Sequence, residues 1–145
     1  MNEESIVLGG GCFWCLEALY QRVRGVNKVI SGFAGGNTQN PTYDEMHDPT
    51  TRNQQDFDIG PGYRSIILFK DEAQKKSIDN SLETVAKRLW QKPITTEIKQ
   101  LDVFWPAEDY HQDWFNKHPE QAYCQIIINP KVIKLKKKFA NLLKD

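Results

Sequence analysis

The sequence has no long run of apolar residues and no excess of either charge. No apolar stretch approaches the roughly 20 residues that a membrane-spanning helix needs, so the sequence predicts no transmembrane segment. Nineteen Lys and Arg residues balance nineteen Asp and Glu residues, so no overall field favours nucleic acid or an anionic membrane as a partner. The opening MNEESIVLGGG lacks the basic start and apolar core of a secretory signal, and we expect none.

Cysteine is also scarce. The chain has three cysteines, an odd number that does not suit an extracellular disulfide framework. We therefore expect a reducing, cytoplasmic setting with at least one reactive thiol. The length of 145 residues, with 39% hydrophobic and 26% charged residues, is typical of one globular domain, and we expect residues 1–145 to form it.

Hydrophobic periodicity predicts strands that alternate with helices. The expected strands cover residues 5–8, 26–33, 63–70, 95–104 and 124–128. The expected helices cover residues 13 to about 24, a segment capped by Asp71 with the stripe Ile78, Leu82, Val85 and Leu89, residues 108–117, and a last helix opened by Pro130 with the stripe Val132, Leu135, Phe139 and Leu142. The segment 37–62, rich in Pro and Gly, is expected to be irregular. This alternation predicts one α/β or α+β domain on a mixed sheet.

The one local excess of charge is a lysine cluster near the C-terminus. Its members are Lys131, Lys134, Lys136, Lys137 and Lys138. We expect the cluster to be the solvated face of the last helix.

The stretch LGGGCFWCL is the most informative part of the sequence. It places Cys12 where a strand gives way to a helix, and backbone N–H groups and the positive end of the helix dipole favour a thiolate there. We therefore expect a lowered pKa for Cys12 and a nucleophilic role. Phe13 and Trp14 predict an apolar slot for a methyl or thioether group, although the same rings would also suit a plain core stripe.

The Cys12–Cys15 spacing is compatible with three kinds of site. A Cys3His zinc site would use Cys12, Cys15, His111 and Cys124, but one C-x-x-C with scattered partners is weak evidence for metal. A C-x-x-C at a helix start is typical of thiol–disulfide exchange. The third possibility is a sulfur nucleophile served by a distant resolving thiol, Cys124.

Several ordered motifs together resemble the A-type peptide methionine sulfoxide reductases. They are GCFW, GFAGG, NPTY, HDPTT, DIGPGYRS, AEDYHQ and a late YC, between about Ile6 and Asn129. The resemblance implies an α+β fold, a two-layer α/β sandwich with a mixed sheet and a ferredoxin-like split βαβ core. It implies reduction of methionine S-sulfoxide, free or in proteins, to methionine. No cofactor is implied, and thioredoxin or another dithiol would be the reductant of a chain that we expect to be monomeric.

The resemblance also implies roles for the residues around the sulfoxide. Cys12 would be the attacking thiolate, and Phe13 and Trp14 would hold the S-methyl group. Tyr43, Asp58 and Tyr63 match residues placed near the sulfoxide oxygen. That oxygen must be hydrogen-bonded or protonated to make the sulfur electrophilic, which is the reason for donors at this place.

The attack would leave a sulfenic acid on Cys12 that a second thiol converts to a disulfide. The resemblance favours Cys124 as the first resolving thiol, with Cys15 as the alternative. We read His111 as a structural residue.

One departure from the family pattern is large. In the family, a segment with a G-H-A-E motif, a strand and a helix lies between NPTY and HDPTT, whereas here Glu45 is followed at once by Met46 and His47. About 25 to 30 residues of strand and helix are absent, and with them the family glutamate near the sulfoxide oxygen. Loss of such an acid typically lowers the rate by about 10² to 10⁴. A catalytically impaired relative, a sulfoxide-binding module and a general C-x-x-C oxidoreductase therefore remain alternatives.

Overall fold

The central sheet has three strands. The computed structural model describes residues 2–36, 54–55, 58–59, 63–91 and 93–145. The strand order is β1-β5-β6, with β1 at Val7–Gly9, β5 at Ile66–Phe69 and β6 at Glu97–Gln100. β5 runs antiparallel to β1 and parallel to β6. The sheet is therefore mixed and the fold is α+β, as predicted.

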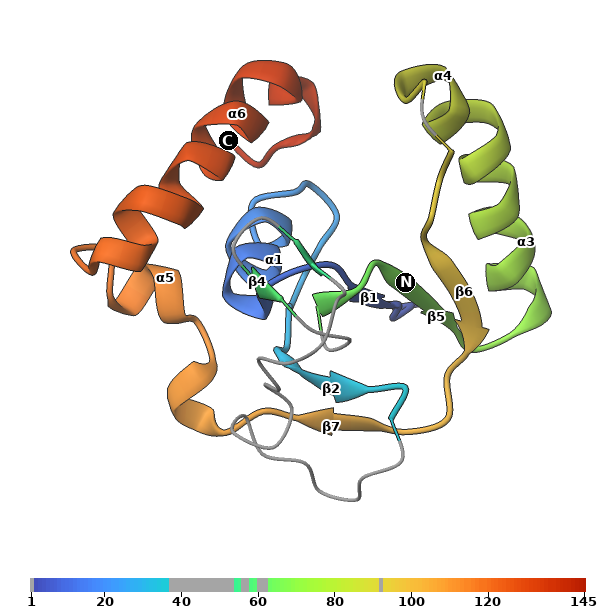
Figure 1. The fold of residues 1–145 in the computed structure, drawn as a ribbon, viewed down its shortest axis with the longest axis horizontal. Coiled ribbons are helices and arrows are strands. Elements are labelled where there is room, and N and C mark those ends of the chain that lie inside the picture. The colour runs from blue at the N-terminus through green and yellow to red at the C-terminus, as the bar shows by residue number, and fades with distance from the viewer. Residues whose placement is uncertain (1, 37–53, 56–57, 60–62, 92) are drawn as a thin grey trace.

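The parallel strands β5 and β6 are joined by a helical crossover. It begins with α3, Glu72–Ser81, and continues through the π-helical turn η2, Leu82–Ala86, and α4, Lys87–Leu89. The Asp71 carboxylate accepts a hydrogen bond from the Gln74 N–H at 2.7 Å, which confirms the predicted cap. Figure 1 shows α4 at the far end of this helix, beyond the sheet. Of the predicted apolar stripe, Ile78 is buried, whereas Val85 and Leu89 are exposed there.

A second group of helices packs together away from α3. It comprises α1 at Phe13–Tyr20, α5 at Trp114–Lys117, the π-helical turn η4 at Cys124–Ile128 and α6 at Asn129–Lys138. α1 contacts α5, η4 and α6 (Figure 1). The helix bundle therefore carries Cys12, which caps α1, and Cys124 on neighbouring elements.

The predicted strand at 124–128 is wrong, because this segment is helical. A strand would bury alternate residues, but Cys124 and Ile128 are buried while Ile126 between them is 68% exposed. That i, i+4 pattern is the helical one. Val132, one turn further on, is also buried, so η4 and α6 present one continuous apolar face to α1.

Two other predicted strands differ most from the structure, although those at 5–8 and 63–70 are also shorter than expected, as β1 and β5. Of residues 26–33 only the end lies in a strand, β2 at Gly32–Ala34, which pairs antiparallel with β7 at Phe104–Pro106. The expected strand at 95–104 thus divides into β6 and the start of β7. Gly32 is required at this pairing, because a Cβ there would collide with the Phe104 ring and the Trp105 carbonyl oxygen.

Two predicted helices also differ from the structure. α1 ends at Tyr20, well before Gly25, whose φ of +87° forms the following turn. The predicted helix at 108–117 is broken in two, a 3-10 turn η3 at Asp109–His111 and then α5, because Asp113 has a φ of 58°.

The chain after α6 returns to the residues that follow α1. After α6 the chain forms η5, Ala140–Leu142, and Arg24 donates its backbone N–H to the Leu142 carbonyl at 2.7 Å. The predicted irregular segment 37–62 lies largely outside the described residues. Within it, β3 at Gln54–Gln55 pairs antiparallel with β4 at Asp58–Ile59.

Candidate active site

A glycine turn places Cys12 at the start of α1. Gly11 has a φ of 78°, a left-handed conformation that glycine adopts without strain, and its N–H donates to the Tyr63 carbonyl at 3.0 Å. Cys12 follows in an extended conformation as the N-cap residue of α1 and is 5% exposed. The turn therefore brings the backbone of Tyr63, a predicted site residue, next to the predicted nucleophile.

Cys12 and Cys15 form a buried pair on the first turn of α1. The Cys15 N–H donates to the Cys12 carbonyl at 3.0 Å, and Cys15 is 3% exposed. A hydrogen bond between the two side chains raises the pKa of the Cys12 thiol strongly, burial raises it further, and a hydrogen bond with Tyr123 opposes the shift in part. The predicted lowering of the Cys12 pKa is therefore wrong. The helix start favours an anion, but the shared proton and the loss of solvent outweigh it.

The Cys15 sulfur lies close to two polar groups from the C-terminal helices. Lys131 Nζ is 3.7 Å from Cys15 Sγ, and Tyr123 Oη is 4.0 Å from it. Of the predicted lysine cluster, four members are exposed: Lys134, Lys136, Lys137 and Lys138. Lys131 is only half exposed and reaches α1, so the prediction of a solvated face is wrong for this one lysine. The signal was its spacing, because Ile128, Lys131 and Leu135 follow the i, i+3, i+7 pattern of one helix face.

Cys124 joins the same cluster from η4. Its side chain is fully buried, and it packs in one apolar cluster with Cys12 and Cys15, together with Ala18, Ile128 and Val132. Burial raises the pKa of the Cys124 thiol, and the charges of Glu120 and Cys15 raise it further. The structure thus brings together the three cysteines that the sequence placed 3 and 109 positions apart, all as thiols.

An aromatic wall lies beside the cysteine pair. The Trp14 ring stacks on Trp114, with centroids 4.3 Å apart and planes inclined by 7°. The Phe13 ring lies 5.7 Å from Phe33, and the buried His111 ring lies 5.4 Å from Phe13 and 5.5 Å from Trp14. Both predicted slot residues are half-buried and pack against the core cluster. Phe13 and Trp14 therefore pack against the core, and the part of each ring that is not buried lies next to Cys12.

Glu17 supports this wall and was not singled out from the sequence. It is 2% exposed, and its carboxylate accepts the backbone N–H groups of Asp113 at 2.8 Å and Trp114 at 3.3 Å. Burial raises the pKa of Glu17, although these two hydrogen bonds oppose the shift. The carboxylate thus caps the start of α5 from α1 and holds Trp114 under Trp14. An acid four residues after Phe13, on the apolar stripe of α1, was the available signal.

The side chains of two predicted site residues lie outside what the structure describes. Tyr43 is not among the described residues, and only the backbone of Asp58, in β4, is described. Their expected places near the sulfoxide oxygen stay predictions.

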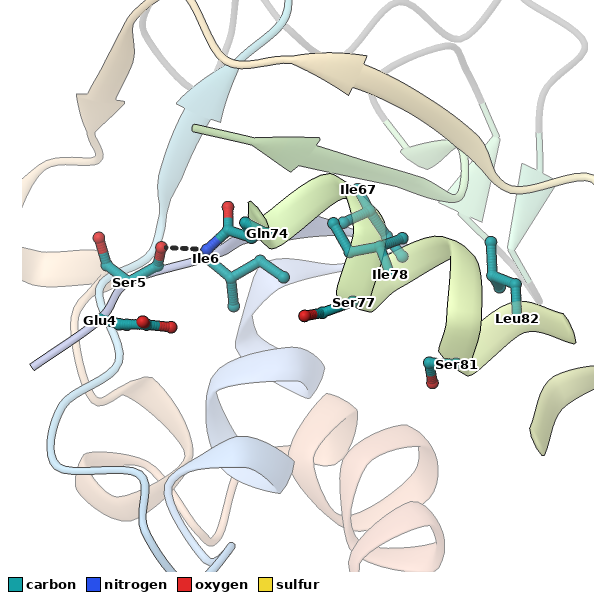
Figure 2. Close-up of a pocket in the computed structure, with 9 residues that line it drawn as sticks. All are labelled: Glu4, Ser5, Ile6, Ile67, Gln74, Ser77, Ile78, Ser81 and Leu82. Atoms are coloured by element: carbon teal, nitrogen blue, oxygen red, sulfur yellow. Dashed lines mark hydrogen bonds between the residues drawn. The ribbon is translucent and has the colours of Figure 1, made fainter. Parts of the chain in front are cut away.

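One groove among the described residues lies away from the cysteines. It is an open groove of about 390 Å³ between α3 and the chain around β1 (Figure 2). Its lining residues are Glu4, Ser5, Ile6, Ile67, Gln74, Ser77, Ile78, Ser81 and Leu82. In Figure 2 the side-chain amide of Gln74 donates to the Ser5 carbonyl, at 3.0 Å, across this groove. Of the candidate catalytic residues whose side chains the structure describes, Cys12 and Tyr63 are not among those that line it.

The described residues offer neither a cluster of metal ligands nor a membrane-spanning helix. They contain no group of three or more His, Cys, Asp or Glu side chains that could hold a metal ion. No helix in the described part of the chain is long and apolar enough to cross a membrane.

A family profile described as "Peptide methionine sulfoxide reductase" matches residues 4–47 and 44–143. The chain is also 40% identical to the peptide methionine sulfoxide reductase MsrA of Arthrobacter sp. (strain FB24), over 94% of this chain and 97% of that protein. The chain belongs to the peptide methionine sulfoxide reductase family. The MsrA of Saccharolobus solfataricus is likewise 40% identical, over 97% of each chain.

Solved structures of the reductase family share the fold. Mxr1 from Saccharomyces cerevisiae in reduced form superposes with a TM-score of 0.65 at 25% identity, over 82% of this chain and 87% of that one. Methionine sulfoxide reductase A of Corynebacterium diphtheriae gives a TM-score of 0.59 at 27% identity, over 79% and 74% of the two chains.

The departure from the family pattern falls at residues 44–47. The two profile matches meet and overlap at residues 44–47, where the sequence predicts the missing segment. The alignment with the Arthrobacter reductase spans 169 residues, 24 more than the whole of this 145-residue chain. The relative therefore has residues without a counterpart in this chain, in agreement with an internal segment that is absent here.

Proposed function

We propose that this chain reduces methionine S-sulfoxide, free or in proteins, to methionine, with Cys12 as the nucleophile. The observation that carries the proposal is the position of Cys12 at the N-cap of α1, beside the Phe13 and Trp14 rings and in one cluster with two further thiols. Membership of the reductase family supports the reaction.

The reaction moves one oxygen atom and two electrons. The Cys12 sulfur attacks the sulfoxide sulfur, the oxygen passes to Cys12 as a sulfenic acid, and methionine leaves. A second thiol, Cys124 or Cys15, then forms a disulfide with Cys12 and releases water. We propose that the S-methyl group of the substrate rests against Phe13 and Trp14, because a thioether gains from contact with aromatic rings.

We also propose that Tyr43, Asp58 and Tyr63 act on the sulfoxide oxygen. A donor aimed at the place where negative charge develops lowers the barrier most in a site that excludes water. The backbone contact between Tyr63 and Gly11 supports this role, since it places the Tyr63 residue beside the turn that leads into Cys12.

The proposal is tested by one turnover. The reduced protein is mixed with an excess of N-acetyl-methionine S-sulfoxide without added reductant, and released N-acetyl-methionine is counted per chain. We expect a burst close to stoichiometric from the wild type, none from Cys12→Ser, and a retained burst from the matched variant Cys124→Ala. A burst that survives Cys12→Ser would refute the assignment of Cys12.

The second candidate function is a sulfoxide-binding module that does not turn over. The strongly raised pKa of Cys12, its burial and the internal family segment that this chain lacks favour this candidate. It predicts saturable binding of a sulfoxide peptide by calorimetry with no methionine burst. A general C-x-x-C oxidoreductase, favoured by the hydrogen-bonded Cys12–Cys15 pair, would instead reduce insulin disulfides.

The remaining parts of the proposal concern the setting. We propose that residues 1–145 act as a single domain and as a monomer in the cytoplasm, that no bound cofactor takes part, and that thioredoxin or another dithiol reopens the disulfide. Multiple turnovers with thioredoxin and its reductase, at a rate proportional to thioredoxin concentration, would check the reductant.

A further inference from the structure

Lys131 differs from the other lysines of α6 in its surroundings. It is half-buried, and its ammonium nitrogen lies 3.7 Å from the sulfur of Cys15, a residue 116 positions away that is 3% exposed. A cation at this distance from a buried sulfur favours the thiolate form, because solvent screens the attraction only weakly there.

The other ionisable groups near Cys15 are also compatible with a thiolate on Cys15. They come from α1, from η4 and from the residue before η4: Cys12, Cys124 and Tyr123. The hydrogen bond between the two thiols raises the pKa of Cys12, and burial raises it further. Cys124 is buried and holds its proton more tightly than an ordinary thiol. Cys15 is the thiol that has an ammonium group 3.7 Å from its sulfur, so we place the negative charge of the three-thiol cluster there.

We propose that Lys131 is a positioning residue that keeps Cys15 as a thiolate, so that Cys15 rather than Cys124 closes the first disulfide with oxidised Cys12. This step rests on the proposed function, which supplies the Cys12 sulfenic acid. The Cys15 sulfur attacks the Cys12 sulfur, a sulfur–sulfur bond forms, and the Cys12 sulfur–oxygen bond breaks. The leaving hydroxide takes up one proton and departs as water, while Cys15 is oxidised and Cys12 is reduced by one electron each.

The test replaces Lys131 by methionine, which keeps the length of the side chain and removes its charge. Loss of a close cation shifts the ionisation midpoint of an acid by about one unit or more. At a pH below both midpoints, one unit means about tenfold less Cys15 thiolate, which a gain in intrinsic nucleophilicity of about threefold partly offsets. We therefore expect Lys131→Met to slow formation of the Cys12–Cys15 disulfide about threefold at a pH below the wild-type midpoint, with the methionine burst preserved.

A pH profile separates this electrostatic role from a purely structural one. Iodoacetamide labelling of Cys15 in the substrate-free protein, located by tandem mass spectrometry, should shift to higher pH by about one unit in Lys131→Met. The shift should be absent in Lys131→Arg, which restores the charge. It should also be absent in the matched control Lys134→Met, which removes an exposed lysine of the same helix.

The outcomes are distinguishable. An unshifted Cys15 profile in Lys131→Met, with a circular dichroism spectrum like the wild type, would overturn the inference. A first disulfide between Cys12 and Cys124 in the wild type would also overturn it. Absence of a methionine burst from the wild type would refute the proposed function instead, while the labelling profile would still decide the role of Lys131.

Discussion

The Glu17 carboxylate gives the sharpest test of how the aromatic wall is held. Its replacement by alanine removes the acceptors for two backbone N–H groups at the start of α5, those of Asp113 and Trp114. A buried donor left unpaired costs about 1 to 3 kcal/mol, and relief of the buried charge offsets a part of the two losses. We therefore expect Glu17→Ala to lower the free energy of unfolding by about 3 kcal/mol.

Thermal unfolding followed by circular dichroism at pH 7 measures this loss. A chain of 145 residues has an unfolding entropy of about 0.3 kcal/mol/K, so the expected fall in Tm is about 10 °C. Glu17→Gln keeps one acceptor oxygen and should fall about half as far. The matched control is Glu83→Ala, which removes an exposed carboxylate paired with Lys87 and should change Tm by less than about 2 °C. Equal Tm values for Glu17→Ala and Glu83→Ala would refute the capping role.

Three further predictions concern the same described residues. Burial holds the pKa of Glu17 above its ordinary value of 4.5, so the folded chain binds this proton more tightly and the associated stability is lost as pH rises. The Tm gap between wild type and Glu17→Ala should therefore widen as pH falls from 7 toward 5; a gap that narrows would contradict this sign. The raised pKa of Cys12 predicts iodoacetamide labelling at pH 7 more than about tenfold slower than that of a small-molecule thiol, and rising through pH 9; rapid labelling at pH 7 would show an ionised Cys12. Asp71→Ala removes the side-chain cap of α3 and should lower stability by about 1 kcal/mol, or about 3 °C in Tm; an unchanged Tm would show that the cap contributes nothing.

Local patterns predicted the elements that depend on neighbouring residues in the chain. The glycine turn, the start of α1 at Phe13 and the cap at Asp71 all follow from a few adjacent residues, and each is found in the structure. The strand prediction for residues 124–128 was wrong because a short run with three isoleucines is compatible, by composition alone, with a strand or with a buried helix face. Only the partner surface on α1 decides between them.

The positions of the candidate site residues at the start of α1 could be predicted from the sequence, whereas the electrostatics around them could not. The motifs placed Cys12, Phe13 and Trp14 correctly at the start of α1. They did not predict the direction of the Cys12 pKa, because it depends on a proton shared with Cys15 and on cover from η4 and α6. Lys131 was missed for the same reason, since its contact crosses 116 positions of the chain.

The stacked indoles of Trp14 and Trp114 also make the redox state of the cysteine pair accessible to tryptophan fluorescence. Trp14 lies in the sequence between Cys12 and Cys15, and its ring is parallel to that of Trp114 at 4.3 Å. A disulfide next to an indole quenches the emission of that indole. The intensity of tryptophan fluorescence would therefore report whether Cys12 is reduced or in a disulfide. The protein thus carries an intrinsic fluorescent probe within one helical turn of Cys12, the proposed nucleophile.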